Sequence, residues 1–112
     1  MFSCIYLISC TSHDNTEYKI GFSKDEKNAK LRLKSHQTGN PYPCKIEYIY
    51  KTKHKRKVEN TLHRMYSPDR KEGEWFSLEI SDVVNFIQIC DKIEKSFDIL
   101  YKENNHFFKQ NK

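Results

Sequence analysis

The sequence lacks the patterns that mark several common classes of small protein. Its four cysteines form no CxxC pair, and none is followed by a histidine at zinc-finger spacing, which argues against a structural zinc site. The apolar start, MFSCIYLISC, is too short to span a bilayer. It also lacks the basic N-terminal region and the A-x-A cleavage site of a signal peptide. We therefore expect a reduced, intracellular protein, in the cytoplasm or nucleus of a host, that is not secreted.

What the sequence does contain is positive charge. The 112 residues carry a formal net charge of +5, with an isoelectric point near 9.0, which suits a polyanionic partner. Hydrophobic residues make up 37% and aromatic residues 13%, so the core must rely on Tyr, Phe and Ile. This length allows one domain with a single modest core.

Three segments have the composition of β-strands. SCIYLISC and YKIGF are apolar and β-branched, and the polar stretch between them predicts a loop, so the two should form a hairpin. CKIEYIY alternates, with Ile46, Tyr48 and Tyr50 predicted on one face. No internal repeat is visible.

Three further segments have helical spacing. The first follows Ser23, a candidate N-cap, and ends before TGNPYP, which is a strong stop signal. The second places Val58, Leu62 and Met65 on one face. The third has the longest apolar stripe, made of Val83, Phe86, Cys90, Ile93, Phe97 and Leu100.

The order strand–strand–helix–strand–helix–helix predicts an α+β fold, a small three-stranded antiparallel sheet flanked by helices. We expect residues 1–78 to form the functional domain, 79–101 to be a C-terminal helix packed on it, and 102–112 to be a polar tail that frays. The stretch SPDRKEGEWFSL before the last helix is expected to be a loop.

The predicted hairpin brings three notable residues to one face of the sheet. If paired residue numbers sum to 25 or 27, Tyr6, Lys19 and Gly21 share a face. The glycine would then leave a bare patch of backbone beside a phenol and an amine, a gap suited to a phosphate.

The first two predicted helices carry a second set of candidate site residues. Arg32 and His36 lie one turn apart, as do Glu59 and His63. An arginine binds phosphate through two hydrogen bonds, and a glutamate can hold a divalent ion whose other ligands are water. Tyr, His or Lys can orient or deprotonate the attacking water. Each residue alone fits a core or surface role, but together they predict a phosphodiester site.

The order and spacing of these residues resemble a known family. IYLI, YKIG, RLKSHQTGNP, VENTLHRMY and GEWFSL, spread over about residues 5–78, resemble the GIY-YIG nuclease superfamily. The likeness is greater to its divergent branch of bacteriophage-type (T5 open-reading-frame) DNA-binding domains, related to meiotically up-regulated fungal proteins. This resemblance implies an endonuclease that hydrolyses DNA phosphodiester bonds with Mg²⁺ or another divalent cation.

The resemblance also implies a role for each motif position. Tyr6 occupies the tyrosine position of the first motif, and Lys19 stands where the second motif usually has its tyrosine. Arg32 matches the arginine thought to stabilise the scissile phosphate, and His36 follows one turn later. Glu59 matches the single metal-binding glutamate.

Two features separate this chain from typical members. A lysine in the second tyrosine position clamps phosphate rather than acting as a base. Where typical members have an asparagine beyond the glutamate, this chain reads RKEGE. His63 belongs to the branch's own Glu-x-x-x-His pattern, and Trp75 and Phe76 to its closing motif. These two aromatic residues are candidates for stacking on a base, but we expect them to anchor the last helix to the sheet.

A basic run precedes the Glu59 helix. KTKHKRK holds five Lys or Arg in seven positions, namely Lys51, Lys53, Lys55, Arg56 and Lys57, and predicts contacts with a phosphate backbone, with a solvated loop as the alternative. The expected partner is nucleic acid, double-stranded DNA rather than a membrane. The first functional hypothesis is a metal-dependent endonuclease. A DNA-binding module that does not cut, and a protein-interaction domain, remain alternatives.

Overall fold

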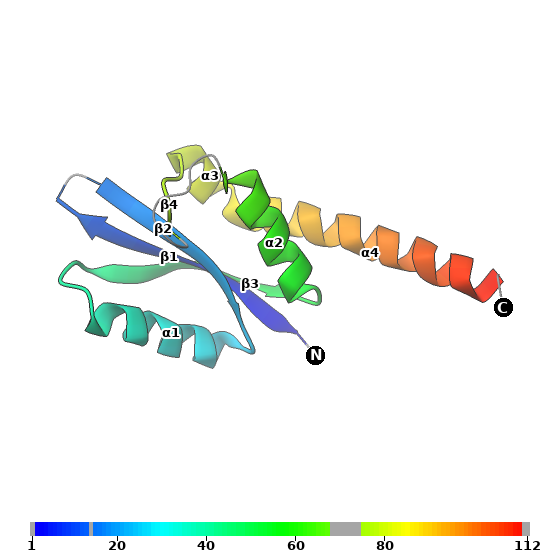
Figure 1. Cartoon of the computed structure of the whole chain (residues 1–112), viewed down its shortest axis with the longest axis horizontal. Helices are drawn as coiled ribbons and strands as arrows, with labels where there is room; N and C mark the ends of the chain where they lie inside the picture. Colours follow the sequence, from blue (N-terminus) through cyan, green and yellow to red (C-terminus); the bar gives the residue numbers. More distant parts are fainter. Residues whose placement is uncertain (1, 14, 68–74, 111–112) are drawn as a thin grey trace.

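An antiparallel sheet lies between two helical layers. The computed structural model describes residues 2–13, 15–67 and 75–110, with side chains as far as residue 102. Four strands pair in the order β3-β1-β2-β4, so the α+β class is confirmed but the expected three strands become four (Figure 1). The strands are β1 (Ser3–Ser12), β2 (Asn15–Ser23), β3 (Cys44–Thr52) and β4 (Trp75–Phe76).

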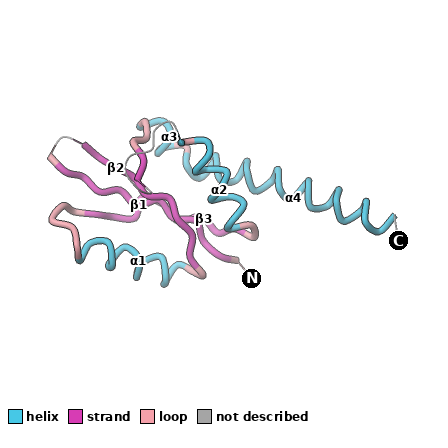
Figure 2. Tube along the Cα trace, in the orientation of Figure 1, coloured by secondary structure: helices cyan, strands magenta, loops and turns pink. Residues whose placement is uncertain are grey.

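Helices cover both faces of this sheet. Helix α1 (Glu26–Thr38) covers one face, while α2 (Lys55–Met65) and the start of α4 (Phe86–Gln110) cover the other (Figures 1 and 2). The short α3 (Ile80–Val84) leads into α4. No helix in the described ranges is long and apolar enough to cross a membrane.

The central strand β1 is buried on both sides, which explains its nearly continuous apolar sequence. Ile5 and Leu7 belong to the core under α2 and α4, while Tyr6 and Ile8 pack with Ala29 of α1. A strand covered on both faces needs apolar side chains at successive positions rather than an alternating pattern.

The hairpin register is one of the two predicted. Tyr6 pairs with Gly21, so partner numbers sum to 27. Both strands run farther than their apolar sequence indicated, because polar residues continue the pairing up to Ser12 and Asn15. Thr11 and Thr16 stabilise this extension through a hydrogen bond of 3.1 Å between their hydroxyl oxygens.

The predicted face of β3 is wrong at Ile46. Leu7 pairs with Tyr48 and Ile8 pairs with Ile46, so Glu47 forms a bulge without a partner of its own. The alternation slips there, and Ile46 packs on the α1 side, whereas Tyr48 packs on the side of α2 and α4. The Glu47 carboxylate accepts a hydrogen bond from the buried Ser9 hydroxyl at 2.8 Å.

The fourth strand lies inside the predicted loop. Trp75 pairs with Lys19 and Phe76 pairs with Tyr18, while residues 68–74 are outside the described part of the chain. Phe76 is fully buried in the same cluster as Phe86 of α4. The expectation that this residue anchors the last helix is therefore confirmed.

Two predicted helix features need correction. The N-cap of α1 is Asp25, whose carboxylate accepts from the backbone N–H of Asn28 at 2.8 Å; Ser23 instead donates to the Asp25 carbonyl. In α2 the predicted core residue Met65 is 48% exposed, and the neighbouring Tyr66 is buried. A core stripe that drifts by one position is a common consequence of the 3.6-residue period.

The last predicted helix is two helices. It breaks at Asn85, and α4 then runs through the region expected to fray and reaches Gln110. Leu100, predicted to be on the core stripe, is 51% exposed because α4 extends beyond the sheet there (Figure 1). Three side-chain pairs dock its first half on the end of β3 and on the residues just after it: Tyr50 with Asp91 at 3.1 Å, Thr52 with Glu94, and His54 with Asp98 at 2.9 Å.

Candidate nucleic-acid interface

The sheet has an open edge where the two helical layers meet. Strand β4 pairs only with Tyr18 and Lys19, so within the described residues β2 has no outer neighbour from Ile20 onward. Side chains from α1 on one face and α2 on the other can therefore reach around this part of β2 to a common space.

A cavity of about 180 Å³ occupies that space, and we call it the edge cavity. Its lining comes from β1 and β2 of the hairpin and from helices α1 and α2: Tyr6, Lys19, Ile20, Gly21, Phe22, Arg32 and Glu59. Five residues predicted from the sequence thus meet at one place, although they come from four elements. The other predicted residues, His36, His63 and the five cations of the basic run, do not line it.

Gly21 makes room for Tyr6. A Cβ atom built on Gly21 would lie 2.9 Å from Cε1 of Tyr6 and closer still to the ring atoms beyond it, which real Cβ atoms do not tolerate. The gap predicted for a phosphate is therefore filled by the phenol ring. Tyr6 is buried, with an exposed fraction of 3%, but its ring still forms part of the cavity wall.

Lys19 and His36 both lie against Trp75. The Lys19 ammonium is 6.0 Å from the centre of the indole ring, and the His36 ring meets the indole edge-on at 6.1 Å. His36 thus lies beside the edge cavity rather than in its lining. Lys19 lines the edge cavity, and the Trp75 indole of β4 contacts its ammonium.

His63 ties α2 to the edge of the sheet. Its Nε2 lies 2.8 Å from the carbonyl oxygen of Ile20, and its ring packs on Phe76 at 5.2 Å between centres. Because a carbonyl can only accept, Nε2 must carry a proton and donate it. His63 lies one turn after Glu59, so this bond positions the part of α2 that carries the glutamate.

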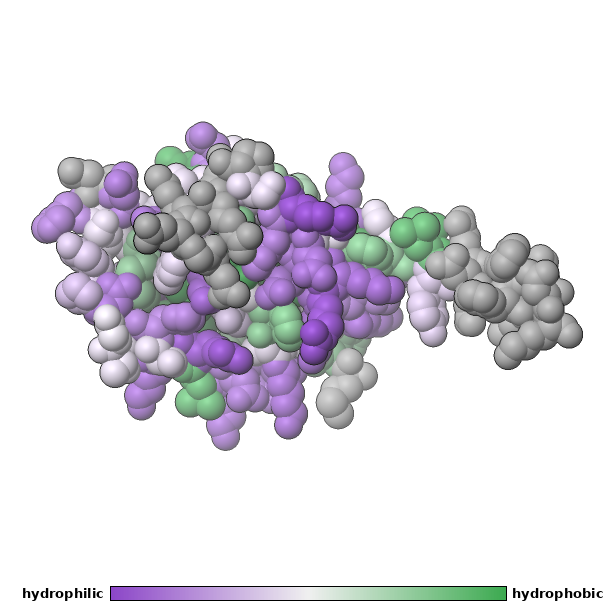
Figure 3. Space-filling model, in the orientation of Figure 1, coloured by the Kyte–Doolittle hydropathy of each residue, from purple (hydrophilic) through white to green (hydrophobic). Residues whose placement is uncertain are grey.

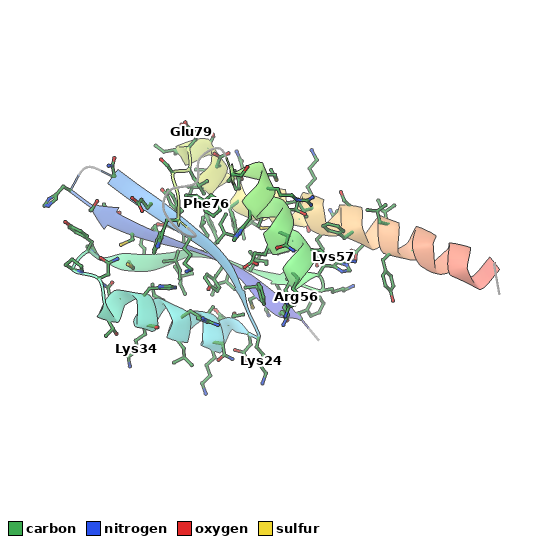
Figure 4. The ribbon with its side chains drawn as sticks, viewed as in Figure 1. Lys24, Lys34, Arg56, Lys57, Phe76 and Glu79 are labelled. Atoms are coloured by element: carbon green, nitrogen blue, oxygen red, sulfur yellow. The ribbon has the colours of Figure 1, made fainter. Side chains whose placement is uncertain are left out.

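Most cations of the basic run lie over aromatic rings, but over different ones. Lys55 and Arg56 lie over Phe22 of the edge cavity, at 5.4 and 5.5 Å from its centre. Lys57 lies over Phe97 of α4, Lys53 lies over Phe2, and Lys51 is exposed near the end of β3. Arg56 and Lys57 mark the start of α2 in Figure 4, and hydrophilic side chains gather over this helix in Figure 3. Two of the five cations therefore extend the cavity's positive surface.

Comparison with known protein families finds a match over most of the chain. Residues 3–107 match the T5orf172 domain, which is most of the chain. The chain belongs to the T5orf172 domain family. This is the GIY-YIG-like, phage-type branch that the motifs indicated, and it is a family of nuclease-like or DNA-binding modules. A comparison with curated proteins finds no match, and neither does one with solved structures.

The match to the T5orf172 domain includes α4, whereas the sequence motifs ended near residue 78. The chain's departure from typical members at RKEGE falls on residues 70–74, which lie outside the described ranges.

Phe22 is a residue of the site that the sequence motifs of this T5orf172 domain did not single out. Its signal was available: an aromatic residue directly after Gly21, at the open end of β2, near a basic helix start.

Among the described residues, the carboxylate of Glu59 is the one acidic group in the lining of the edge cavity. Within the described residues no group of three or more His, Cys, Asp or Glu could hold a metal ion. A hard ion such as Mg²⁺ is often held by one or two carboxylates, with water and substrate phosphate as its other ligands. Glu59 in this T5orf172 domain fits that kind of binding and not a closed protein cage.

Proposed function

We propose that this T5orf172 domain is an endonuclease that hydrolyses a DNA phosphodiester bond at the edge cavity with the help of a divalent cation such as Mg²⁺. The observation that carries the proposal is the meeting of Arg32, Lys19, Tyr6 and Glu59 around one cavity. A guanidinium, an ammonium, a phenol and a carboxylate are what hydrolysis of a phosphodiester requires: phosphate binding, water orientation and a metal ligand.

Arg32 and Lys19 bind the phosphate in this scheme. Arg32 is exposed on α1, so its planar guanidinium is available to bind two phosphate oxygens at once. Lys19 adds a point charge from β2, beside the indole of Trp75. Lys55 and Arg56, over Phe22, attract the neighbouring backbone.

Glu59 would hold the cation, and Tyr6 or His36 would position the water. A bound divalent ion supplies Lewis-acid stabilisation of the phosphate and a lower pKa for its bound water. Tyr6 reaches the cavity from β1 on the side of Gly21, where its hydroxyl can hydrogen-bond the nucleophile. His63 acts as a positioning residue, because its Nε2 donates to Ile20.

Nicking of supercoiled plasmid in Mg²⁺ tests this proposal. Glu59→Gln should lower the nicking rate about 100-fold or more, because the charge of a catalytic metal is worth several kcal/mol in the transition state. Glu26→Gln, on an exposed carboxylate of α1 paired with Lys30, should nick at the wild-type rate. Equal nicking by Glu59→Gln and the wild type would contradict the role of Glu59.

A second candidate is a DNA-binding module that does not cut. It is favoured by Lys19, since a lysine in place of the second tyrosine serves binding better than proton transfer. In that case the wild type would bind plasmid in a salt-dependent manner, without nicking it in any divalent cation.

A further inference from the structure

A second pocket lies beside the edge cavity, and we call it the loop pocket. It has a volume of about 240 Å³ and is lined by Cys10, Ser12, Glu17, Asn40, Tyr42 and Trp75. Pockets that enclose a drug-sized ligand measure roughly 300–1,000 Å³. The loop pocket therefore suits a smaller group, such as a single flat ring system between its two aromatic residues.

One aromatic wall is held in place by the loop after α1. Gln37 Nε2 donates to the Tyr42 carbonyl at 2.9 Å, and Gln37 Oε1 accepts from the Cys44 N–H at 2.7 Å. Asn40 Oδ1 accepts from the Tyr42 N–H at 3.0 Å, and Asn40 Nδ2 donates to Cys10 Sγ at 2.9 Å. The two amide side chains of QTGNPYP thus fix the backbone around Tyr42. A wall fixed before binding loses little conformational entropy on binding.

The other aromatic wall joins the loop pocket to the edge cavity. Trp75 lines the loop pocket, and the ammonium of Lys19, which lines the edge cavity, lies 6.0 Å from the indole centre. A nucleotide carries its phosphate and its base on one sugar. A strand with a phosphate in the edge cavity therefore brings a base of the same or the adjacent nucleotide to the loop pocket.

We propose that the loop pocket receives one unpaired base of the nucleic acid whose phosphate lies in the edge cavity, an inference that rests on the proposed function. Tyr42 and Trp75 supply stacking surfaces, which bind unpaired bases. The Glu17 carboxylate, which has no hydrogen bond or ion pair to another described residue, repels phosphate but accepts from an amino group. Cytosine, adenine and guanine carry such a group, and thymine does not.

The substrate class that fits the loop pocket is nucleic acid with an accessible, amino-bearing base, as in a single-stranded segment, a flap or a mismatch. A fully paired duplex would have to expel a base to fill the loop pocket, which costs unstacking and unpairing energy. The preferred substrate should therefore contain an unpaired nucleotide next to the bound phosphate.

Fluorescence of Trp75 provides a direct test, because it is the chain's one tryptophan. The protein is titrated in EDTA with a short oligo(dC), with oligo(dT), and with an abasic oligonucleotide of equal length. Oligo(dC) should change the Trp75 emission and bind about tenfold more tightly than the abasic strand, which lies within the range that one stacked base contributes. Oligo(dT) should bind with intermediate affinity, since it stacks but offers no amino group.

Variants separate stacking from general binding. Tyr42→Ala should weaken oligo(dC) binding about fivefold or more and leave the abasic affinity unchanged, whereas Tyr42→Phe should bind as the wild type does. Circular dichroism confirms that each variant is folded. Equal affinity for oligo(dC) and the abasic strand, with unchanged Trp75 emission, would overturn the base pocket and leave the phosphate cavity standing. Failure to bind any of the three strands would overturn the inference too, and nicking of supercoiled plasmid by the same protein would then show that the proposed function stands without it.

Discussion

Tyr6 and Gly21 are partners across β1 and β2. The Tyr6 ring fits in its position only because Gly21 has no side chain. The ring of Tyr6 covers the Cα of Gly21, so that the phenol can be buried and still form a wall of the edge cavity. The glycine therefore contributes to the site indirectly, by allowing the tyrosine its position.

Replacement of Gly21 by alanine should be costly. The new Cβ would meet the Tyr6 ring, and overpacking of this kind lowers the free energy of unfolding by about 1–3 kcal/mol. Urea denaturation measures the effect. Gly39→Ala is the matched control, because its Cβ would meet no atom within 4 Å. In a Tyr6→Ala background the Gly21→Ala cost should largely disappear, and an undiminished cost there would argue against the contact.

The sequence predicted which residues of the site meet, but not what each one touches. Alternation along both strands of the hairpin, with either predicted register, was enough to place Tyr6, Lys19 and Gly21 on one face. It could not indicate that the tyrosine ring fills the space above the glycine, because that depends on the rotamer of Tyr6. The hydrogen bond of His63 to Ile20 could not be predicted either. Its acceptor is a backbone carbonyl at an open strand edge, and the sequence does not show which carbonyl a side chain will contact.

Among the secondary-structure elements, α4 depends most on a few polar contacts. Glu94 is buried and accepts from the Thr52 hydroxyl and from the Lys53 N–H at 3.2 Å. These bonds, with the pairs made by Asp91 and Asp98, join three successive turns of α4 to the end of β3 and to the residues just after it.

Removal of the Glu94 carboxylate should loosen this helix. Glu94→Ala leaves the Thr52 hydroxyl and the Lys53 N–H without their partner, at a cost of about 1–3 kcal/mol for buried polar groups. Thermal unfolding followed by circular dichroism is a suitable measurement. Lys92→Ala, an exposed position two residues earlier in α4, should change stability by less than about 0.5 kcal/mol. Similar losses in the two variants would contradict the docking role of Glu94.

Elements with strong periodicity could be predicted, and those set by tertiary contacts could not. The hairpin and helices α1 and α2 follow from apolar spacing and stop signals. Strand β4 has two residues, too few for any period, and exists because β2 offers it an edge. The bulge at Glu47 is likewise a matter of strand pairing, with Ser9 bonded to its carboxylate, and the sequence of β3 alone does not contain it.

At the scale of the whole molecule, two thiols with raised pKa values lead us to expect a loss of stability in alkali. Burial raises the pKa of the Cys90 thiol to about 12, and burial also raises that of Cys44 to about 12. A folded pKa above the unfolded value of 9.0 means that the folded state keeps the proton after the unfolded state has lost it. The contribution of these thiols to stability is then constant below about pH 9, and it falls as the pH rises from there toward the folded pKa.

Denaturant unfolding between about pH 8 and 10.5 measures this slope. Each such thiol contributes up to about 1.4 kcal/mol per pH unit, so Cys90→Ala should reduce the slope by that amount even though it lowers stability at every pH. A slope that is the same in Cys90→Ala and the wild type would show that Cys90 does not titrate in this way.

The distribution of charge over the molecule predicts how DNA affinity depends on salt. Each phosphate contact contributes about 0.9 to the slope of log affinity against log salt concentration. The double variant Lys55→Ala/Arg56→Ala should therefore lower the slope by about 2. Lys24→Ala/Lys34→Ala is the matched control, since these side chains point away from the sheet on the α1 side (Figure 4). An equal drop in the control would mean that binding is spread over the whole basic surface.

For the molecule as a whole, we propose that the two helical layers meet at the sheet edge to bind and cut a phosphodiester. A staged single-turnover assay tests it most directly: excess protein is bound to supercoiled plasmid in EDTA, Mg²⁺ is added, and nicked plasmid is followed in time. The wild type and Glu59→Gln should bind plasmid equally before Mg²⁺ is added, and the wild type alone should nick it afterwards. Equal nicking by both proteins, or no nicking by bound wild type, would contradict the account.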